Sequence, residues 1–391
     1  MGRMALTSRK LAFLIGQICV SFLLAGLTGL AGCKIFDHRL EAAQAEHLNA
    51  YIRVRAEREQ EMFEDARRLN HAAEQAFRRR LAEMQDMPVD AEFDRFFPIM
   101  DDGTRRSAPE LYDGTTLSAG DYVFGIGAFL AEGAAMTDTE KRRYLAGFQT
   151  VRAVGEAFLG RFSNLYYFTP DRRMVMFAPE REDRLVFYRS EAPADFDLRG
   201  DEDAALFDLR ANPNSAMQCT ALSRFVYADG GDRAASACRQ PVRDGDELLG
   251  AFGSSISMTE TLASALDMPP SYGMNMLFDH AGNIISRGPP PAVRAGQDRS
   301  DPVLAPEAIM EMLQQDPRAF GVFAAPDGDW MIAFSRIEGP SWYFVSVVDL
   351  ATIRQTSRFW GLILSLIVLG ALLGSLAIGA LLDRAVPSEA G

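Results

Sequence analysis

Two long apolar runs dominate the hydrophobic pattern of this chain, one near each end. Residues 11–32 and residues 359–382 contain no charged side chain. A helix needs about 20 apolar residues to cross the hydrocarbon core of a bilayer. Both runs therefore predict transmembrane helices, with a long polar and mixed segment between them.

The first run has a second interpretation that the sequence leaves open. Its end, Leu30-Ala31-Gly32-Cys33, reads as a bacterial lipobox, in which Cys33 becomes a lipidated N-terminus after cleavage. The run is longer than the roughly 7–15 apolar residues of a signal peptide, and a charged, helix-forming stretch follows Cys33 directly. These features favour an uncleaved anchor over a lipoprotein signal.

The basic residues set the expected orientation. Arg3, Arg9 and Lys10 precede the first run, whereas only Asp383 and Arg384 follow the second before the chain ends. Cytoplasmic flanks of membrane helices carry the excess of basic residues. We therefore expect a bacterial inner-membrane protein with both ends in the cytoplasm and residues 34–358 in the periplasm.

A long helix is predicted after the first run. Residues 34–87 contain neither proline nor glycine and are rich in strong helix formers. One apolar stripe recurs at three- and four-residue steps: Met62, Ala66, Leu69, Ala73, Phe77, Leu81 and Met84. At about 1.5 Å per residue, such a stem extends for about 75 Å. It is either an amphipathic helix packed on a domain or a signalling stem at a dimer axis.

The pattern then changes to two sets of short strands. In the first set, a helix over residues 137–159, with Thr137 or Asp138 as N-cap, precedes strands that alternate with turn residues. The strands of this set are predicted at residues 164–168, 174–177, 185–188, 221–227, 234–242 and 248–258. The second set begins after Pro269-Pro270 and contains one short helix at residues 307–315. Its strands are predicted at residues 274–278, 283–286, 321–325, 330–337 and 342–348.

These elements give one expected domain organisation. It comprises a cytoplasmic N-terminus (1–10), a transmembrane helix or lipoprotein signal (11–33), a stem helix (34–87), a membrane-distal domain (88–266), a membrane-proximal domain (267–350), a transmembrane helix (359–382) and a short cytoplasmic tail (383–391).

Composition and cysteine usage narrow the chemistry. The net charge of −13 excludes the basic face that nucleic-acid binding requires. In an oxidising periplasm, Cys219 and Cys238 are candidates for a disulfide, the alternative being two unrelated buried thiols. None of the four histidines lies near these cysteines at the spacing of a zinc site. The chain also contains no nucleophile elbow or phosphate-binding loop, so we expect no enzyme, no metal and no cofactor.

Four segments carry a resemblance to a known family. They are Leu165-Tyr166-Tyr167-Phe168, the stretch GDELLGAFGSSISM at residues 245–258, the stretch NMLFDHAGN at residues 275–283, and Trp342-Tyr343-Phe344-Val345. In this order between two membrane spans, they resemble the double Cache family of extracytoplasmic sensor domains of bacterial histidine kinases and chemoreceptors. The resemblance implies an α+β fold, with a long N-terminal stem helix and two PAS-like antiparallel sheets, the distal one larger.

Two departures from the family qualify what the resemblance implies. Ser254 or Ser255 stands where amine-binding members carry an acidic residue, which puts amino-acid sensing in doubt. Residues 383–391 are too few for the cytoplasmic output domain of those relatives. We therefore expect a sensory receptor subunit that signals through a separate partner, such as the histidine kinase of a two-component system. The alternatives are a non-signalling binding or scaffold lipoprotein and a truncated sensor histidine kinase.

The expected ligand is a periplasmic small molecule, with an anion favoured because arginine offers a fork to a carboxylate. Aromatic walls and a few polar groups form such pockets, and the candidates are Tyr166, Tyr188, Arg189, Arg224, Tyr227 and Asp229. The competing interpretation is that the aromatic residues are core and the arginines solvated. Gly370 with Gly374, and Ser375 with Gly379, have the small-residue spacing of close helix pairs, so a homodimer is a further candidate.

Overall fold

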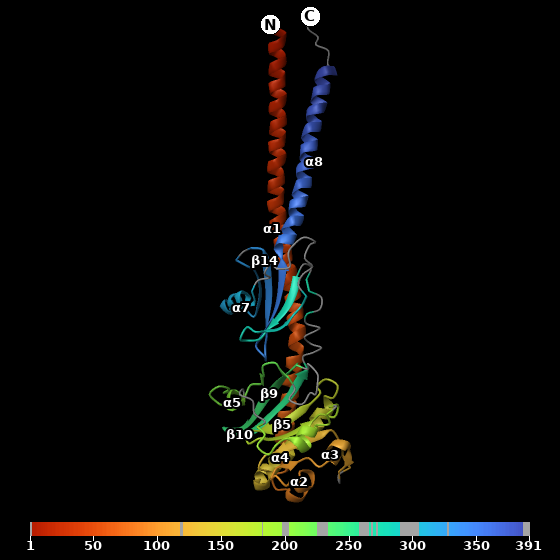
Figure 1. The fold of residues 1–391 in the computed structure, drawn as a ribbon, viewed down its shortest axis with the longest axis vertical. Helices are drawn as coiled ribbons and strands as arrows, with labels where there is room; N and C mark the ends of the chain where they lie inside the picture. Colours follow the sequence, from red (N-terminus) through yellow and green to blue (C-terminus); the bar gives the residue numbers. More distant parts are fainter. Residues whose placement is uncertain are drawn as a thin grey trace.

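The chain forms a long rod in which a single helix carries two β-sheets (Figure 1). The computed structural model describes residues 2–117, 120–181, 183–197, 203–224, 234–257, 266, 269–270, 273–289, 305–326 and 328–385. Both ends of the chain lie at the same end of the rod. The larger sheet lies at the opposite end, and the smaller one lies between it and the apolar helices. The predicted α+β architecture is confirmed.

The first apolar run and the predicted stem form one continuous helix, α1 (Gly2–Glu83). The absence of glycine and proline after Cys33 explains why no break separates the two parts. The helix ends shortly before Pro88, because a proline disfavours helical geometry in the residue that precedes it. The remaining helices are α2 (Asp90–Phe96), α3 (Glu110–Asp113), η1 (Gly133–Ala135), α4 (Asp138–Ala157), the π-helical turn η2 (Phe187–Glu191), α5 (Asp203–Phe207), α7 (Pro306–Gln315) and α8 (Leu350–Ala385).

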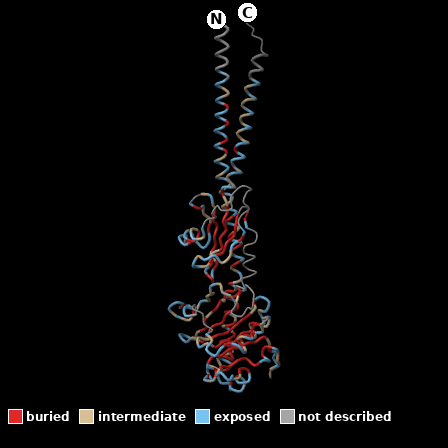
Figure 2. The backbone as a smooth tube through the Cα atoms, viewed as in Figure 1, coloured by how far each residue is buried: buried red, intermediate tan, exposed pale blue. Residues whose placement is uncertain are grey.

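Within the described ranges, two helical segments are long and apolar enough to cross a membrane, one beginning at Ile15 in α1 and the other, Arg358–Ile378, in α8. Figure 2 shows that most of their surface is exposed, whereas both sheets contain buried cores. The two helices pack where small residues face each other. A Cβ atom on Gly361 would lie 2.0 Å from Cys33 Sγ, and one on Gly29 would lie 1.6 Å from Ser365 Oγ. Gly370 and Gly374 have no atom in range of such a Cβ, so the prediction of self-association stays untested.

The distal sheet has eight strands in the order β1-β4-β6-β5-β10-β9-β7, with β8 pairing β9. The strands are β1 (Arg105–Arg106), β4 (Ile126–Leu130), β5 (Leu165–Thr169), β6 (Arg173–Phe177), β7 (Gln218–Cys219), β8 (Ser223–Arg224), β9 (Ala234–Asp244) and β10 (Glu247–Ser257). A separate two-stranded ribbon joins β2 (Thr115–Thr116) to β3 (Tyr122–Val123). The predicted disulfide is present between Cys219 on β7 and Cys238 on β9.

The strand predicted at residues 185–188 is wrong. Arg184 and Leu185 have positive φ angles, 49° and 54°, which turn the backbone out of an extended path. The chain then forms the π-helical turn η2. The run Leu185-Val186-Phe187-Tyr188 has the composition of a buried strand, but a short apolar run alone does not distinguish a strand from a buried turn.

α1 and α4 cover the inner face of the distal sheet. Phe77 of α1 packs on Tyr167 and Phe252, with ring centroids 5.3 Å and 5.6 Å away. Gly250 sits at a bulge between β10 and β9 with φ 136°, and a Cβ there would lie 2.6 Å from the Tyr167 ring. Glycine is therefore required here, because the backbone has a positive φ and the aromatic core leaves no room for a side chain. α4 begins as predicted, with a capping box between Thr137 and Glu140.

The proximal sheet has five strands in the order β12-β11-β15-β14-β13. They are β11 (Gly273–Phe278), β12 (Ile284–Arg287), β13 (Phe320–Ala324), β14 (Trp330–Ile337) and β15 (Trp342–Asp349). α7 covers one face, and α1 covers the other, where Phe63 meets Trp342 edge-to-face at 5.8 Å. α8 follows β15 without an intervening residue, so the proximal sheet leads directly into the second apolar helix.

Candidate functional site

The face of the distal sheet that points away from α1 and α4 carries a separate aromatic cluster. Alternation along β5 divides its side chains between the two faces, with Tyr167 in the inner core and Tyr166 and Phe168 outside. We call this second set the outer cluster; its buried members are Tyr112, Phe129, Ala131, Tyr166, Phe168, Met174, Met176, Ala178, Leu185, Tyr188, Ala192, Leu206 and Ala251. It combines aromatic walls with nearby arginines, which is the composition expected for a ligand pocket.

Two of the sequence candidates, Tyr166 and Tyr188, lie in the outer cluster. Both are buried, and Tyr188 is held between Phe187 and Phe196 at ring distances of 5.5 Å and 6.5 Å. Tyr166 lies beside Gly253 of β10, where an added Cβ would come within 2.6 Å of the tyrosine oxygen. The structure therefore brings these two tyrosines together in one cluster.

Arg189, the third candidate, lies at the edge of the outer cluster. Its guanidinium stacks over the Tyr112 ring at 4.8 Å and donates hydrogen bonds to the carbonyls of Arg184 and Pro109, at 3.2 Å and 3.4 Å. Burial, and next the positive charge of Arg184, lower the pKa of Arg189. Its Nε is buried without a hydrogen-bond partner, and within the described ranges no carboxylate forms an ion pair with it. This arginine is thus available to an anion.

Arg106 belongs to the site but was not among the predicted residues. It is 3% exposed, lies 5.1 Å from the Phe129 ring centroid, and donates to the carbonyls of Tyr188 and Ala192. It therefore fixes both ends of the turn that carries Tyr188 and Arg189. The sequence offers little signal for this role, because Arg105-Arg106 after a turn usually reads as a solvated pair.

The other three candidates cannot be placed at the site. Arg224 belongs to β8, where its backbone pairs with Ala234, but its side chain is not described. Tyr227 and Asp229 lie outside the described residues.

The position of the two serines on β10 follows from the strand register. Ser254 is fully buried opposite Cys238, on the side of α1, and its Oγ has no hydrogen-bond partner. Because side chains alternate along a strand, Ser255 points toward the side of the outer cluster. Ser255 is therefore the serine on the side of the outer cluster, and Ser254 is the one in the inner core.

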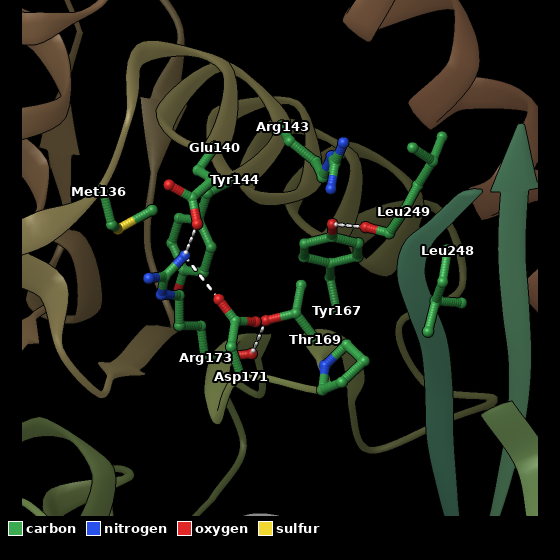
Figure 3. A pocket seen from close by; sticks show the side chains of 11 residues that line it. Met136, Glu140, Arg143, Tyr144, Tyr167, Thr169, Asp171, Arg173, Leu248 and Leu249 are labelled. Carbon is green, nitrogen blue, oxygen red and sulfur yellow. Dashed lines mark hydrogen bonds and ion pairs between the residues drawn. The ribbon is translucent and has the colours of Figure 1, made fainter.

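A cavity of about 250 Å³ opens at the edge of the inner face, between α4, the β5–β6 turn and β10 (Figure 3). Tyr144 and Tyr167 form its buried wall, and both hydroxyls are engaged, donating to the carbonyls of Met174 and Leu249. Arg173 reaches Glu140 at 2.7 Å and Asp171 at 2.6 Å, as the dashed lines in Figure 3 show.

The charges in this edge cavity compensate one another. Burial raises the pKa of Glu140, but hydrogen bonds from Arg173 and Thr137 outweigh that effect and bring the pKa to about 2. Arg143 is paired with Glu247 in the same way. A ligand would have to displace these pairs, so the edge cavity reads as a structural feature. In the part of the chain that the structure describes, no group of His, Cys, Asp and Glu could hold a metal ion.

Comparisons with known proteins found similarity in structure alone. The sequence matches no protein-family model and no curated protein. The structure is similar to the sensory domain of the Campylobacter jejuni chemoreceptor Tlp3, with a TM-score of 0.44 and 11% identity over 82% of this chain and 99% of that one. The ligand-binding domain of the Pseudomonas aeruginosa PAO1 amino acid chemoreceptor PctC, in complex with GABA, gives a TM-score of 0.38 and 14% identity, covering 78% of this chain and 100% of that one.

A third similar structure is the ligand-binding domain of the Pseudomonas fluorescens chemoreceptor CtaA in complex with L-isoleucine. Its TM-score is 0.31 at 17% identity, and the match covers 54% of this chain and 79% of that one. All three are double Cache sensory domains of chemoreceptors, and they are not enzymes.

Proposed function

We propose that this chain is a sensory receptor subunit of the bacterial inner membrane that binds a small anionic molecule at the outer cluster. Residues 34–358 lie in the periplasm in this proposal, divided into a stem (34–87), a distal domain (88–266) and a proximal domain (267–350). The observation that carries the proposal is Arg189, a half-buried cation at an aromatic wall with no carboxylate partner among the described residues. A carboxylate would supply the missing counter-charge through a charge-assisted hydrogen bond.

The path of α1 supports a signalling role. The same helix packs on the inner face of the distal sheet, then on the proximal sheet, and continues into the apolar run. A ligand that shifts the distal sheet against α1 therefore acts on a rigid element that reaches the membrane. A separate cytoplasmic or membrane partner, such as a histidine kinase, would read that shift.

The position of Cys33 supports an uncleaved anchor over a lipoprotein. Cys33 lies within α1, and its Sγ fits against Gly361 of α8, where no side chain larger than hydrogen has room. Cleavage before Cys33 would remove the part of α1 that packs along the second apolar helix. The mass of the mature N-terminus tests this directly, because a chain that begins at Cys33 would contradict the uncleaved anchor.

The similar structures indicate which ligands to test first. Solved structures of the Tlp3 and PctC domains hold isoleucine, valine or GABA, all of which carry a carboxylate. The resemblance to the family puts Ser254 or Ser255 where an amine would meet an acidic partner, and Ser255 is the one on the side of the outer cluster. We therefore expect carboxylates without an amine to bind this chain more tightly than amino acids do.

The experiment is a calorimetric titration of the full chain in nanodiscs with succinate, GABA and L-isoleucine. The variant Arg189→Gln should weaken binding by about tenfold or more, the usual effect of removing a charged hydrogen-bond donor. Arg184→Gln is the matched control, because Arg184 contacts the same Tyr112 ring but is already paired with Asp113. Equal affinities of wild type and Arg189→Gln for each bound ligand would rule out the proposed site.

A further inference from the structure

A second cleft lies at the membrane-distal tip, on the helical side of the sheet and away from the outer cluster. Its volume is about 490 Å³, and its walls come from the end of α1, from α2, from α4 and from the loop between β2 and β3. Figure 1 shows α2 and α4 at the end of the rod farthest from the two termini. We call this the tip cleft.

Three arginines line the tip cleft, and two of them lack a carboxylate partner. Arg152 is paired with Asp121 at 2.9 Å. Arg80 donates to the amide oxygen of Gln149 at 3.0 Å, and Arg95 stacks on the Phe96 ring at 5.7 Å. Within the described residues, neither Arg80 nor Arg95 forms an ion pair with a carboxylate.

The cleft therefore holds uncompensated positive charge. Burial, followed by repulsion from Arg152, lowers the pKa of Arg80, although the charges of Glu83 and Asp121 oppose the shift. The lining contains three arginines and two carboxylates, Asp121 and Glu92. It therefore carries an excess of one positive charge. In a chain with a net charge of −13, this local excess on half-buried and exposed side chains favours an anionic ligand.

The floor of the cleft is apolar. Phe96 and Phe148 are 4% and 1% exposed, their ring centroids lie 5.4 Å apart, and Leu117 completes the wall. The accessible apolar part of the lining is the half-buried Leu117 and the exposed Ala91, and a purely inorganic anion would leave it in contact with water. A molecule with both an acid group and an apolar body satisfies both parts of the lining.

We propose that the tip cleft binds a small aryl or alkyl carboxylate, with the carboxylate between Arg80 and Arg152 and the apolar body against Leu117 and Ala91. Arg80 lies in the last turn of α1. The bound carboxylate joins the end of the stem helix to α4, so this second site acts on α1 independently of the outer cluster.

The test uses 4-fluorobenzoate as the probe, followed by fluorine NMR during titration into the full chain in nanodiscs. Saturable binding is expected, weakened about tenfold in Arg80→Gln. Arg79→Gln is the matched control, because Arg79 is an exposed neighbour that does not line the cleft, and its affinity should stay within twofold of wild type. Glu92→Gln should tighten binding by about twofold, since it removes a repelling charge.

Two comparisons on the unmodified chain keep the test independent of how the variants fold. The neutral analogue 4-fluorobenzyl alcohol should bind at least about tenfold more weakly than the acid, and acetate should compete less well than benzoate. Equal binding of acid and alcohol, or an unchanged affinity in folded Arg80→Gln, overturns the proposal. Arg189→Gln should bind the probe as wild type does, which separates failure of this site from failure of the outer cluster.

Discussion

The two sheets contact the same helix through very different interfaces. The distal interface is mainly apolar and aromatic, centred on Phe77 between Tyr167 and Phe252, with one buried hydrogen bond from Asn70 to the Cys238 carbonyl at 3.2 Å. The proximal interface contains a network of polar groups. The Tyr51 hydroxyl lies 2.8 Å from the amide nitrogen of Asn275, whose oxygen accepts a hydrogen bond from Ser346 at 2.9 Å.

A buried ion pair distinguishes the proximal interface further. Arg55 and Glu59 lie one turn apart on α1 at 3.4 Å, with side chains 7% and 6% exposed, and Arg55 stacks over Phe344 of β15 at 5.5 Å. Burial raises the pKa of Glu59, although Arg55 and Arg58 oppose the shift. Apolar packing tolerates small sliding, whereas hydrogen bonds and ion pairs fix one register. The proximal contact therefore carries more of the groups that fix one register of the helix, and the distal contact more of the aromatic packing.

The largest effect is expected at the distal interface. Phe77→Ala removes a fully buried ring and should cost about 3–5 kcal/mol of unfolding free energy, because a cavity is left among the remaining aromatics. Hydrogen exchange with mass spectrometry reads the two sheets separately, and the amides of β5 and β10 should lose protection while those of β14 and β15 keep it. Val54→Ala, at an exposed position on the same helix, is the control. Equal loss in both sheets would show that the two interfaces are not independent.

A slightly smaller effect is expected from breaking the proximal ion pair. Glu59→Leu leaves the Arg55 charge buried without this partner and should cost about 3 kcal/mol. The double variant Arg55→Leu/Glu59→Leu should recover most of that loss, because two packed apolar side chains replace a pair with a high desolvation cost. Denaturant unfolding of the four chains gives the coupling free energy. Additive losses in the double variant would mean that the two side chains do not act as a pair.

The sequence predicted the scaffold better than the site because the scaffold depends on patterns that repeat. The stem stripe through Phe77, the alternation around Tyr167 and the capping residue Thr137 each follow from local periodicity, and all lie where they were expected. Cys219 and Cys238 form a disulfide because β7 and β9 are neighbours in the sheet. The sequence could predict this pairing only from the periplasmic compartment and the small number of cysteines, since strand order is not visible in local patterns.

The site depends on backbone turns that the hydrophobic pattern of the sequence does not predict. The residues around Leu185 form a π-helical turn that points Tyr188 into the outer cluster, and the turn is held by Arg106 from a strand far away in the sequence. Likewise, Arg80 reads as one of several basic residues near the end of a helix. Only packing against Gln149 and Arg152 shows that it lacks a carboxylate partner among the described residues.

The smallest expected effect is on pH dependence, and it has opposite signs in the two regions. In the distal domain, the pKa of Glu140 falls to about 2, so its contribution to stability is full above about pH 4.5 and is lost as the pH falls toward 2. In the proximal domain, the pKa of Glu59 is raised, so the wild-type fold gains stability from this group as the pH falls through that raised value to its ordinary value. As the pH falls from 6 to 3, the unfolding free energy of wild type should therefore approach that of Glu140→Gln. Over the same range, the unfolding free energy of wild type should rise relative to that of Glu59→Gln. Denaturant unfolding at several pH values measures both differences. Parallel slopes would refute the contrast between Glu140 and Glu59, because the contrast requires the fold to stabilise the anion of one carboxylate and to destabilise the anion of the other.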